Sequence, residues 1–156
     1  KNLWPTWKIL GPSASFLWGG LDEIEDTGRA ILVESIGDAL MLREHGVPET
    51  LCLFGTTMSE TVLGYLISTA PREIIVSTNL DEPKMINGRM KRAGQEAAVK
   101  ISRALRSFFD EDVVCTVHPP AGVKDWNCAT PEQIAAAFKE QENELDTEPT
   151  ASSINS

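Results

Sequence analysis

The chain has 156 residues, with 14 Lys and Arg against 23 Asp and Glu, and its formal net charge at pH 7 is −9. The length suits one compact domain, and a hydrophobic content of 42% excludes disorder over the whole chain. The acidic balance excludes a nucleic-acid coat that works by bulk positive charge. It leaves a nucleic-acid enzyme open, because net charge does not say where the charges lie.

The charges are unevenly distributed along the chain. The stretch 84–106 has a net charge of +6, whereas the segment 139–156 has a net charge of −4. The bases of the first stretch are Lys84, Arg89, Lys91, Arg92, Lys100, Arg103 and Arg106. The chain is therefore split between one basic segment and a strongly acidic remainder.

The cysteines and the hydropathy pattern indicate the type of compartment in which the protein works. The three cysteines are widely spaced and form no CxxC pair, which favours a reducing compartment and excludes a zinc knuckle. No apolar run has the length of a membrane span, and no signal peptide is visible. The chain begins at Lys1 rather than Met, as expected of a fragment of a longer protein.

The N-terminal residues are rich in aromatic and turn-forming types. They predict two short strands around Gly11-Pro12, at 9–10 and 15–18, and then a loop through the acidic residues 22–26.

A regular alternation of strands and helices follows. Short apolar runs predict strands at 30–33, 51–54, 74–76 and 113–117. Capping residues and apolar periodicity predict helices at 35–45, 59–70 and 90–109, and from 131 to about 142. A polar loop with Pro83 and Gly88 precedes the third of these helices.

This order of elements predicts an α/β fold with a parallel four-stranded sheet flanked by helices and a short N-terminal β-hairpin. We divide the chain into a hairpin and linker at 1–29, a main domain at 30–142 and a disordered acidic and polar tail at 143–156. In such sheets ligands bind beyond the carboxyl ends of the strands, so the residues just after each strand are the candidates for function.

Two carboxylates follow strands of the predicted sheet and should converge at the same end of it. Glu34 comes directly after the first strand, and Asp81 comes shortly after the third. Converging carboxylates repel unless a proton or cation separates them, and oxygen ligands without His or Cys suit Mg²⁺ or Mn²⁺. Taken singly, each has a structural alternative: Glu34 beside a helix N-terminus and Asp81 in a turn.

Five sequence blocks, spread over about 30–130, occur in the order found in one family. They are Ile31-Leu32-Val33-Glu34-x-x-Gly37-Asp38-Ala39-Leu40, Phe54-Gly55-Thr56, Ile74-Ile75-Val76-Ser77-Thr78-Asn79-Leu80-Asp81, Ala93-Gly94-Gln95-Glu96-Ala97-Ala98, and Pro119-Pro120 followed by Lys124-Asp125-Trp126-Asn127. Together they resemble the TOPRIM domain, in the version found in bacterial and bacteriophage DNA primases.

The resemblance implies a catalytic domain that makes RNA primers on single-stranded DNA during replication by Mg²⁺-dependent nucleotidyl transfer, with Mn²⁺ as a substitute ion. It implies catalytic roles for Glu34, Asp38 and Asp81. The implied metal ligands are Glu34, Asn79, Asp81 and Glu82. Asn79 departs from the family, because it stands where the first Asp of an Asp-x-Asp pair is found. From its capping position, Asp38 also has a structural alternative as the partner of Ser35.

The basic segment gains a role from this resemblance. The residues expected to contact nucleic acid or nucleotide phosphates are Lys84, Arg89, Lys91, Arg92, Lys124 and Asp125. The other bases of 84–106 are interpreted as a solvated helix face. Trp126 is expected to be a packing residue, although base stacking is an alternative.

The partners implied are single-stranded DNA, NTPs and, as a candidate, a replicative helicase, in the cytoplasm of a bacterial or phage-infected cell and without membrane association. This fragment is expected to be inactive alone. The alternatives are a TOPRIM nuclease or recombination protein, and a non-catalytic module that binds nucleic acid or a partner. Asn79 keeps the last alternative open.

Overall fold

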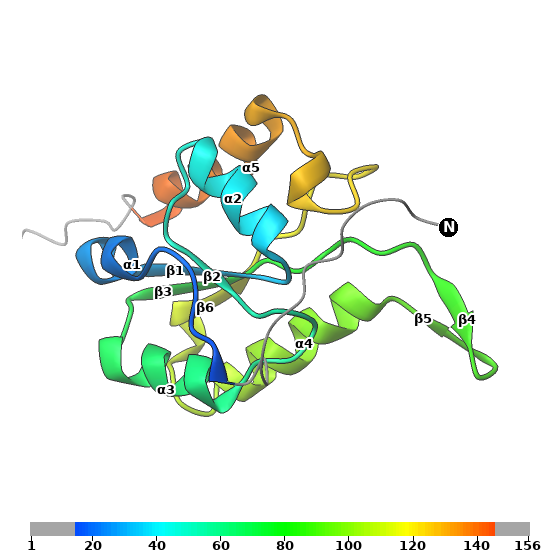
Figure 1. Ribbon diagram of the computed structural model, residues 1–156, viewed down its shortest axis with the longest axis horizontal. Coiled ribbons are helices and arrows are strands. Elements are labelled where there is room, and N and C mark those ends of the chain that lie inside the picture. The colour runs from blue at the N-terminus through cyan, green and yellow to red at the C-terminus, as the bar shows by residue number, and fades with distance from the viewer. Residues whose placement is uncertain (1–14, 146–156) are drawn as a thin grey trace, which may run out of the picture.

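The computed structural model describes residues 15–145, which form a four-stranded parallel sheet in the order β2-β1-β3-β6 (Figure 1). The strands are β1 (Arg29–Val33), β2 (Thr50–Cys52), β3 (Glu73–Val76) and β6 (Val114–Thr116). All four predicted strands are present, and the α/β class with its parallel sheet is confirmed.

Helices cover both faces of the sheet. In Figure 1, α2 (Ile36–Glu44) and α5 (Pro131–Leu145) lie above it, and α3 (Glu60–Thr69) and α4 (Ala93–Leu105) lie below it. The remaining helices are α1 (Leu21–Thr27) and the 3₁₀ turns η2 (Glu111–Val113) and η3 (Trp126–Cys128).

The period-two alternation of the strands divides the core into two layers. In β1, Ala30 and Leu32 pack toward α3 and α4, whereas Ile31 and Val33 pack toward α2 and α5. All four side chains are fully buried, as expected of a parallel sheet covered on both faces. The continuous apolar run that predicted this strand is therefore a direct consequence of its position.

The N-terminal part differs from the prediction. Residues 21–27, expected as a loop, form α1, and the side chain of Ile24 is fully buried in the layer of α3 and α4. Of the predicted hairpin, the strand at 9–10 lies outside the described residues. The chain at 18–20 pairs with the outer edge of β2, where the N–H of Cys52 donates to the carbonyl of Trp18 at 2.9 Å. This pairing covers an edge strand.

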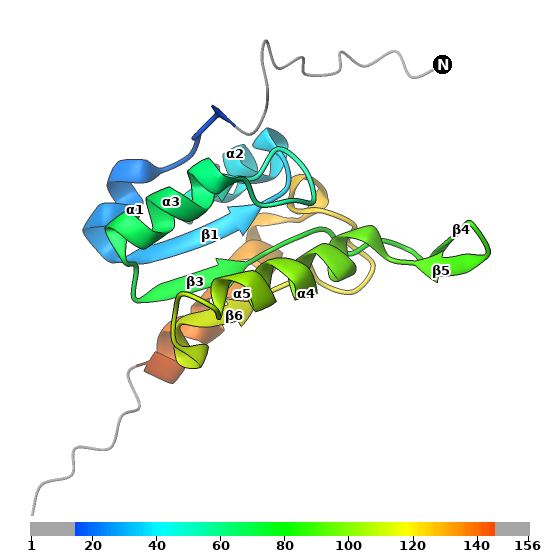
Figure 2. The same cartoon turned by 90° about the horizontal axis from the view of Figure 1, so that it is seen from below.

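The polar loop predicted before the third long helix is a β-hairpin. It consists of β4 (Lys84–Ile86) and β5 (Arg89–Lys91), and Figure 2 shows it projecting beyond the end of α4. Asn87 and Gly88 have φ values of 50° and 73°, the left-handed conformation that a tight type I′ turn requires. Helix α4 accordingly begins at Ala93 rather than near Met90, and it ends at Leu105 rather than at Phe109.

The C-terminal helix extends through Leu145, so the first residues of the predicted tail are helical. The rest of that tail, 146–156, lies outside the described residues. Within residues 15–145, no helix has the length and apolar character needed to cross a membrane.

Candidate functional site

The site lies where the chain changes direction across the sheet. From β1 the chain passes to β2 on one side and then returns to β3 on the other, so β1 and β3 form a topological switch point. Figure 2 shows both strands pointing toward the end that carries the β4–β5 hairpin. Glu34 follows β1 and Asn79 follows β3 at this end, and Glu34 Oε1 accepts a hydrogen bond from the Asn79 N–H at 2.9 Å. The predicted convergence of these two segments is present.

Gly94 allows helix α4 to approach these strand ends closely. A Cβ atom at this position would lie 2.1 Å from the Asn79 carbonyl oxygen and 3.1 Å from Glu34 Oε1. The hydroxyl of Thr78 also donates to the Gly94 carbonyl at 2.7 Å. The first turn of α4 is therefore packed against the end of β3, and only glycine fits there.

Asp81 joins the same arrangement from the loop after β3. Its Oδ2 accepts from the Gly94 N–H at 2.8 Å, so the carboxylate satisfies an open donor in the first turn of α4. Gln95 donates from Nε2 to the Asp81 carbonyl at 3.1 Å. Among residues 15–145, the second carboxylate oxygens of Glu34 and Asp81 accept no protein hydrogen bond. Each acid is thus held by one oxygen, and its other oxygen is free of hydrogen bonds to the described residues.

Burial and charge act together on Glu34. Burial raises the pKa of its carboxyl, and the negative charges of Asp81 and Asp38 raise it further. The Asn79 N–H and the Lys124 ammonium lower the pKa but do not offset these effects. The ionised form of Glu34 therefore gains from any cation placed between it and Asp81.

Asp38 occupies a different position from the other two acids. It is 1% exposed, with Oδ2 accepting from the Ser35 hydroxyl at 2.6 Å and Oδ1 accepting from the Asn127 N–H at 3.2 Å. Both oxygens are thus used to cap α2 and to hold η3 against it. The capping contact predicted between Ser35 and Asp38 is therefore present, and both Asp38 oxygens hold neighbouring elements in position. The catalytic role of Asp38 stays a prediction.

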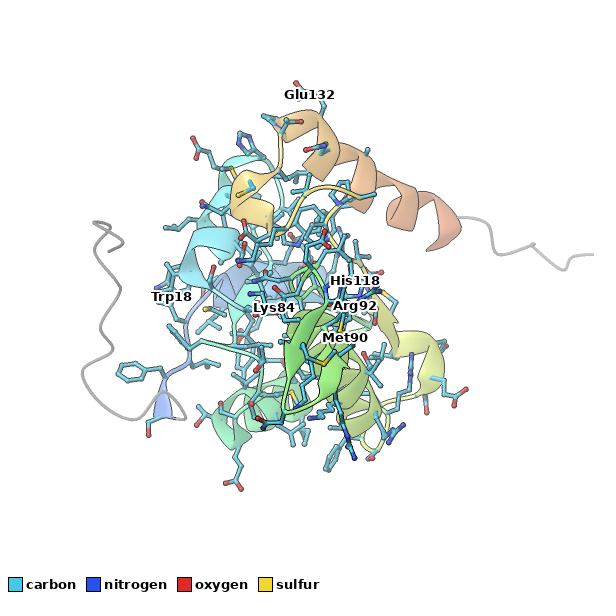
Figure 3. All side chains as sticks on the ribbon, turned by 90° about the vertical axis from the view of Figure 1, so that its right-hand side faces the viewer. Trp18, Lys84, Met90, Arg92, His118 and Glu132 are labelled. Carbon is cyan, nitrogen blue, oxygen red and sulfur yellow. The ribbon has the colours of Figure 1, made fainter. Side chains whose placement is uncertain are left out.

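A pocket of about 530 Å³ opens beside Asp81. Its polar lining consists of Asp81, Glu82, Lys84, Arg92, Gln95 and Lys124. Figure 3 looks onto this end of the molecule and shows Lys84 and Arg92 close together near its centre. Five predicted site residues are therefore brought together, and three of them are bases that suit phosphate groups.

Gln95 is the lining residue that the sequence reasoning missed. It lies in the block Ala93-Gly94-Gln95-Glu96-Ala97-Ala98, directly after Gly94. Its position beside Gly94 was the only feature of the sequence that pointed to a place near the site. The structure places its amide against the Asp81 carbonyl.

Other predicted residues lie apart from this pocket. Arg89 and Lys91 are exposed on β5. Asp125 is half-buried, and its Oδ1 is buried without a hydrogen-bond partner among the described residues. Trp126 is fully buried, donates from Nε1 to Ser77 Oγ at 2.8 Å and packs against the Phe138 ring. It is a packing residue, as predicted.

The acids at this end of the sheet fit one of the two common kinds of divalent metal site. Within the described part of the chain, no group of three or more His, Cys, Asp and Glu side chains is placed to form a metal site. Mg²⁺, however, is often held by one or two carboxylates, with water and substrate phosphates as its other ligands. Asp81 lines the basic pocket, and the Glu34 carboxyl lies near enough to Asp81 and Lys124 for their charges to act on its pKa. The free oxygens of these two acids fit that second kind of site.

No family model matches the sequence, and no curated protein matches it. Solved structures do match the fold. The RNA polymerase domain of Mycobacterium tuberculosis primase DnaG aligns with a TM-score of 0.63 and 18% identity, covering 86% of this chain and 43% of that one.

Two further structures agree. The Escherichia coli primase catalytic core aligns with a TM-score of 0.59 and 22% identity, over 90% of this chain and 42% of that one. The DnaG primase catalytic domain bound to single-stranded DNA aligns with a TM-score of 0.55 and 18% identity, over 87% of this chain and 39% of that one. The chain spans about two fifths of these structures. The likeness of the fold to primase catalytic cores is thereby confirmed.

Proposed function

We propose that the chain is the catalytic TOPRIM domain of a DNA primase, which transfers nucleotides to make RNA primers on single-stranded DNA. The observation that carries this proposal is the pair Glu34 and Asp81. Glu34 directly follows β1 and Asp81 lies in the loop after β3, each with one free oxygen, and Asp81 lines a pocket with Lys84, Arg92 and Lys124. The fold shared with primase catalytic cores supports it.

The three bases are proposed to hold the triphosphate of the incoming nucleotide or the backbone of the template. Each ammonium or guanidinium group offers donors to phosphate oxygens, and Arg92 can bind two oxygens at once.

The proposed ligands of Mg²⁺ or Mn²⁺ are Glu34, Asp81 and the neighbouring Asn79 and Glu82. When bound, such an ion activates a hydroxyl nucleophile and stabilises the charge of the phosphoryl group.

Positioning is the contribution of the remaining residues. The hydrogen bonds from Asn79 and Gly94 fix the orientation of both carboxylates before any ligand arrives. Asp38 keeps η3 in place, and with it the loop that carries Lys124. The proposed setting is the cytoplasm of a bacterial or phage-infected cell, with NTPs and a replicative helicase as partners.

Primer synthesis by the full-length protein tests this proposal. We expect template-dependent RNA synthesis that requires Mg²⁺ or Mn²⁺ and is lost in Asp81→Asn. Arg72→Gln is the control, because Arg72 is exposed and donates to the Thr27 carbonyl, away from the site. Nicking of DNA without primer synthesis would instead support a TOPRIM nuclease or recombination protein.

A non-catalytic binding module is the second candidate. It is favoured by Asn79, which replaces a charged ligand, and by the absence of a three-acid cluster among residues 15–145. Calorimetric titration of the 156-residue chain with Mg²⁺ or Mn²⁺ separates the two. Heat of binding that disappears in Asp81→Asn supports the enzyme, whereas no binding by the unaltered chain supports the module.

A further inference from the structure

The β4–β5 hairpin has two chemically different faces. In the antiparallel register Lys84 lies opposite Lys91, and Met85 lies opposite Met90. Because side chains alternate along a strand, Lys84, Arg89 and Lys91 share one face and the two methionines share the other. The hairpin thus carries its three bases on one face, the basic face, and both methionines on the other, the apolar face.

No acidic residue within the hairpin offsets the positive charge of its basic face. The segment 84–91 contains three bases and no acid. Among the side chains that the structure describes, Lys84, Arg89 and Lys91 form no ion pair with an acid. Like charges directly opposite each other destabilise a two-stranded ribbon, which is itself of marginal stability. An anionic ligand that bridges Lys84 and Lys91 removes this cost.

The apolar face is exposed and borders a second basic surface. Met85 and Met90 are 65% and 58% exposed, although methionine is usually a buried residue. Met90 also lines a groove of about 720 Å³ between the hairpin and α4, together with Val99. Arg92, Lys100 and Arg103 line the same groove, together with one acid, Glu96. The groove beside Met90 therefore has a predominantly basic lining.

We propose that the β4–β5 hairpin is a nucleic-acid-binding arm. Its bases hold the phosphodiester backbone, and Met85 and Met90 contact the sugars and bases of the same strand or duplex. Charge complementarity favours nucleic acid over a protein partner, and apolar side chains on basic elements can contact bases directly. Lys84 belongs to both the arm and the pocket, so the bound strand would lead into the proposed nucleotide site.

This inference rests on the nucleic-acid binding in the proposed function, but not on catalysis. Its test is fluorescence anisotropy with the 156-residue chain and labelled oligonucleotides, single-stranded and duplex, over a range of salt concentrations. The double variant Arg89→Gln/Lys91→Gln leaves the pocket lining intact. It should bind about tenfold more weakly, and the slope of log affinity against log salt should fall by about 2.

The double variant Met85→Ser/Met90→Ser tests the other face. We expect about fivefold weaker binding with an unchanged salt slope, because apolar contacts release no counterions. The matched controls are Arg72→Gln and Ile67→Ser, an exposed base and an exposed apolar residue on other elements. Both should bind like the unaltered chain, and circular dichroism should show all four variants folded.

The outcomes separate the two proposals. Loss confined to one oligonucleotide supports the arm and identifies whether it holds template strand or duplex. Unaltered binding by both hairpin variants overturns the arm alone, and would leave the methionines as a surface for a protein partner. No binding of either oligonucleotide by the unaltered chain overturns the arm together with the nucleic-acid part of the proposed function.

Discussion

Glu34 and Asn79 are joined by a hydrogen bond of 2.9 Å that connects the ends of β1 and β3, two strands that are neighbours in the sheet but distant in the chain. The acceptor is one oxygen of the proposed metal-binding carboxylate. The same contact therefore stabilises the switch point and orients the acid.

Replacing Glu34 by glutamine should separate these two roles. Gln retains an oxygen that can accept from the Asn79 N–H, so we expect a thermal midpoint within a few degrees of the unaltered chain. Mg²⁺-dependent primer synthesis should fall about 100-fold or more, because the negative charge is lost. Thermal unfolding and a primer-synthesis assay measure the two effects. Retained activity would show that Glu34 is not a metal ligand.

Gly94→Ala should both destabilise the fold and disturb the site. The added Cβ would lie 2.1 Å from the Asn79 carbonyl oxygen, which forces α4 away from the end of β3. We expect a loss of about 1–3 kcal/mol in the free energy of unfolding, measured by urea denaturation.

Gly64 provides the matched control for that substitution. It lies in α3, and a Cβ atom there would meet nothing within 4 Å. Gly64→Ala should therefore stabilise the protein by about 0.5–1 kcal/mol, because alanine loses less conformational entropy in a helix. Equal effects of the two substitutions would contradict the close packing of α4 against β3.

Asp38 should make stability depend on pH. Burial raises the pKa of this carboxyl above its usual 3.8, so the folded state holds the proton more tightly than the unfolded state. Its contribution to stability is greatest at low pH and is lost as pH rises from about the ordinary value through the raised folded value.

Asp38→Asn removes this titration and retains one oxygen acceptor. Relative to the variant, the unaltered chain should therefore lose stability as pH increases through that range. Urea denaturation of both proteins between pH 3.5 and pH 7 measures the difference. Parallel stability curves would show that the folded and unfolded states share one pKa at this residue.

Asn79→Asp should strengthen metal binding. It places a third carboxylate near Glu34 and Asp81, where the repulsion is relieved only by a cation or a proton. We expect about tenfold tighter binding of Mn²⁺ by calorimetry, together with lower stability in the absence of metal ions. Glu60→Gln, at an exposed acid in the first turn of α3, is the control and should leave the affinity unchanged. Unchanged affinity in Asn79→Asp would favour the non-catalytic module.

Local patterns predicted much of this fold correctly. The apolar runs of β1 and β3 and the Ser59 cap of α3 are signals carried by adjacent residues. The errors lie where distant contacts decide the structure. Helix α1 forms in an acidic segment because Ile24 is buried in the core. Helix α4 begins at Ala93, where Asp81 accepts from the Gly94 N–H, and the preceding residues pair as β5.

The candidate site, like the fold, has some features that local sequence predicts and others that distant contacts decide. The sequence by itself determined the residue types and their placement after buried strands. Parallel strands end at one edge of the sheet, so the residues that follow them converge there. Only the tertiary structure decided that Asp38 uses both oxygens in positioning and that Lys124 faces the pocket of Asp81. It also decided that Arg89 and Lys91 belong to a projecting hairpin. The positions of Asp38 and Lys124 depend on hydrogen bonds between segments far apart in the chain, which no local pattern encodes. The hairpin, in contrast, has a local signal in the Asn87-Gly88 turn.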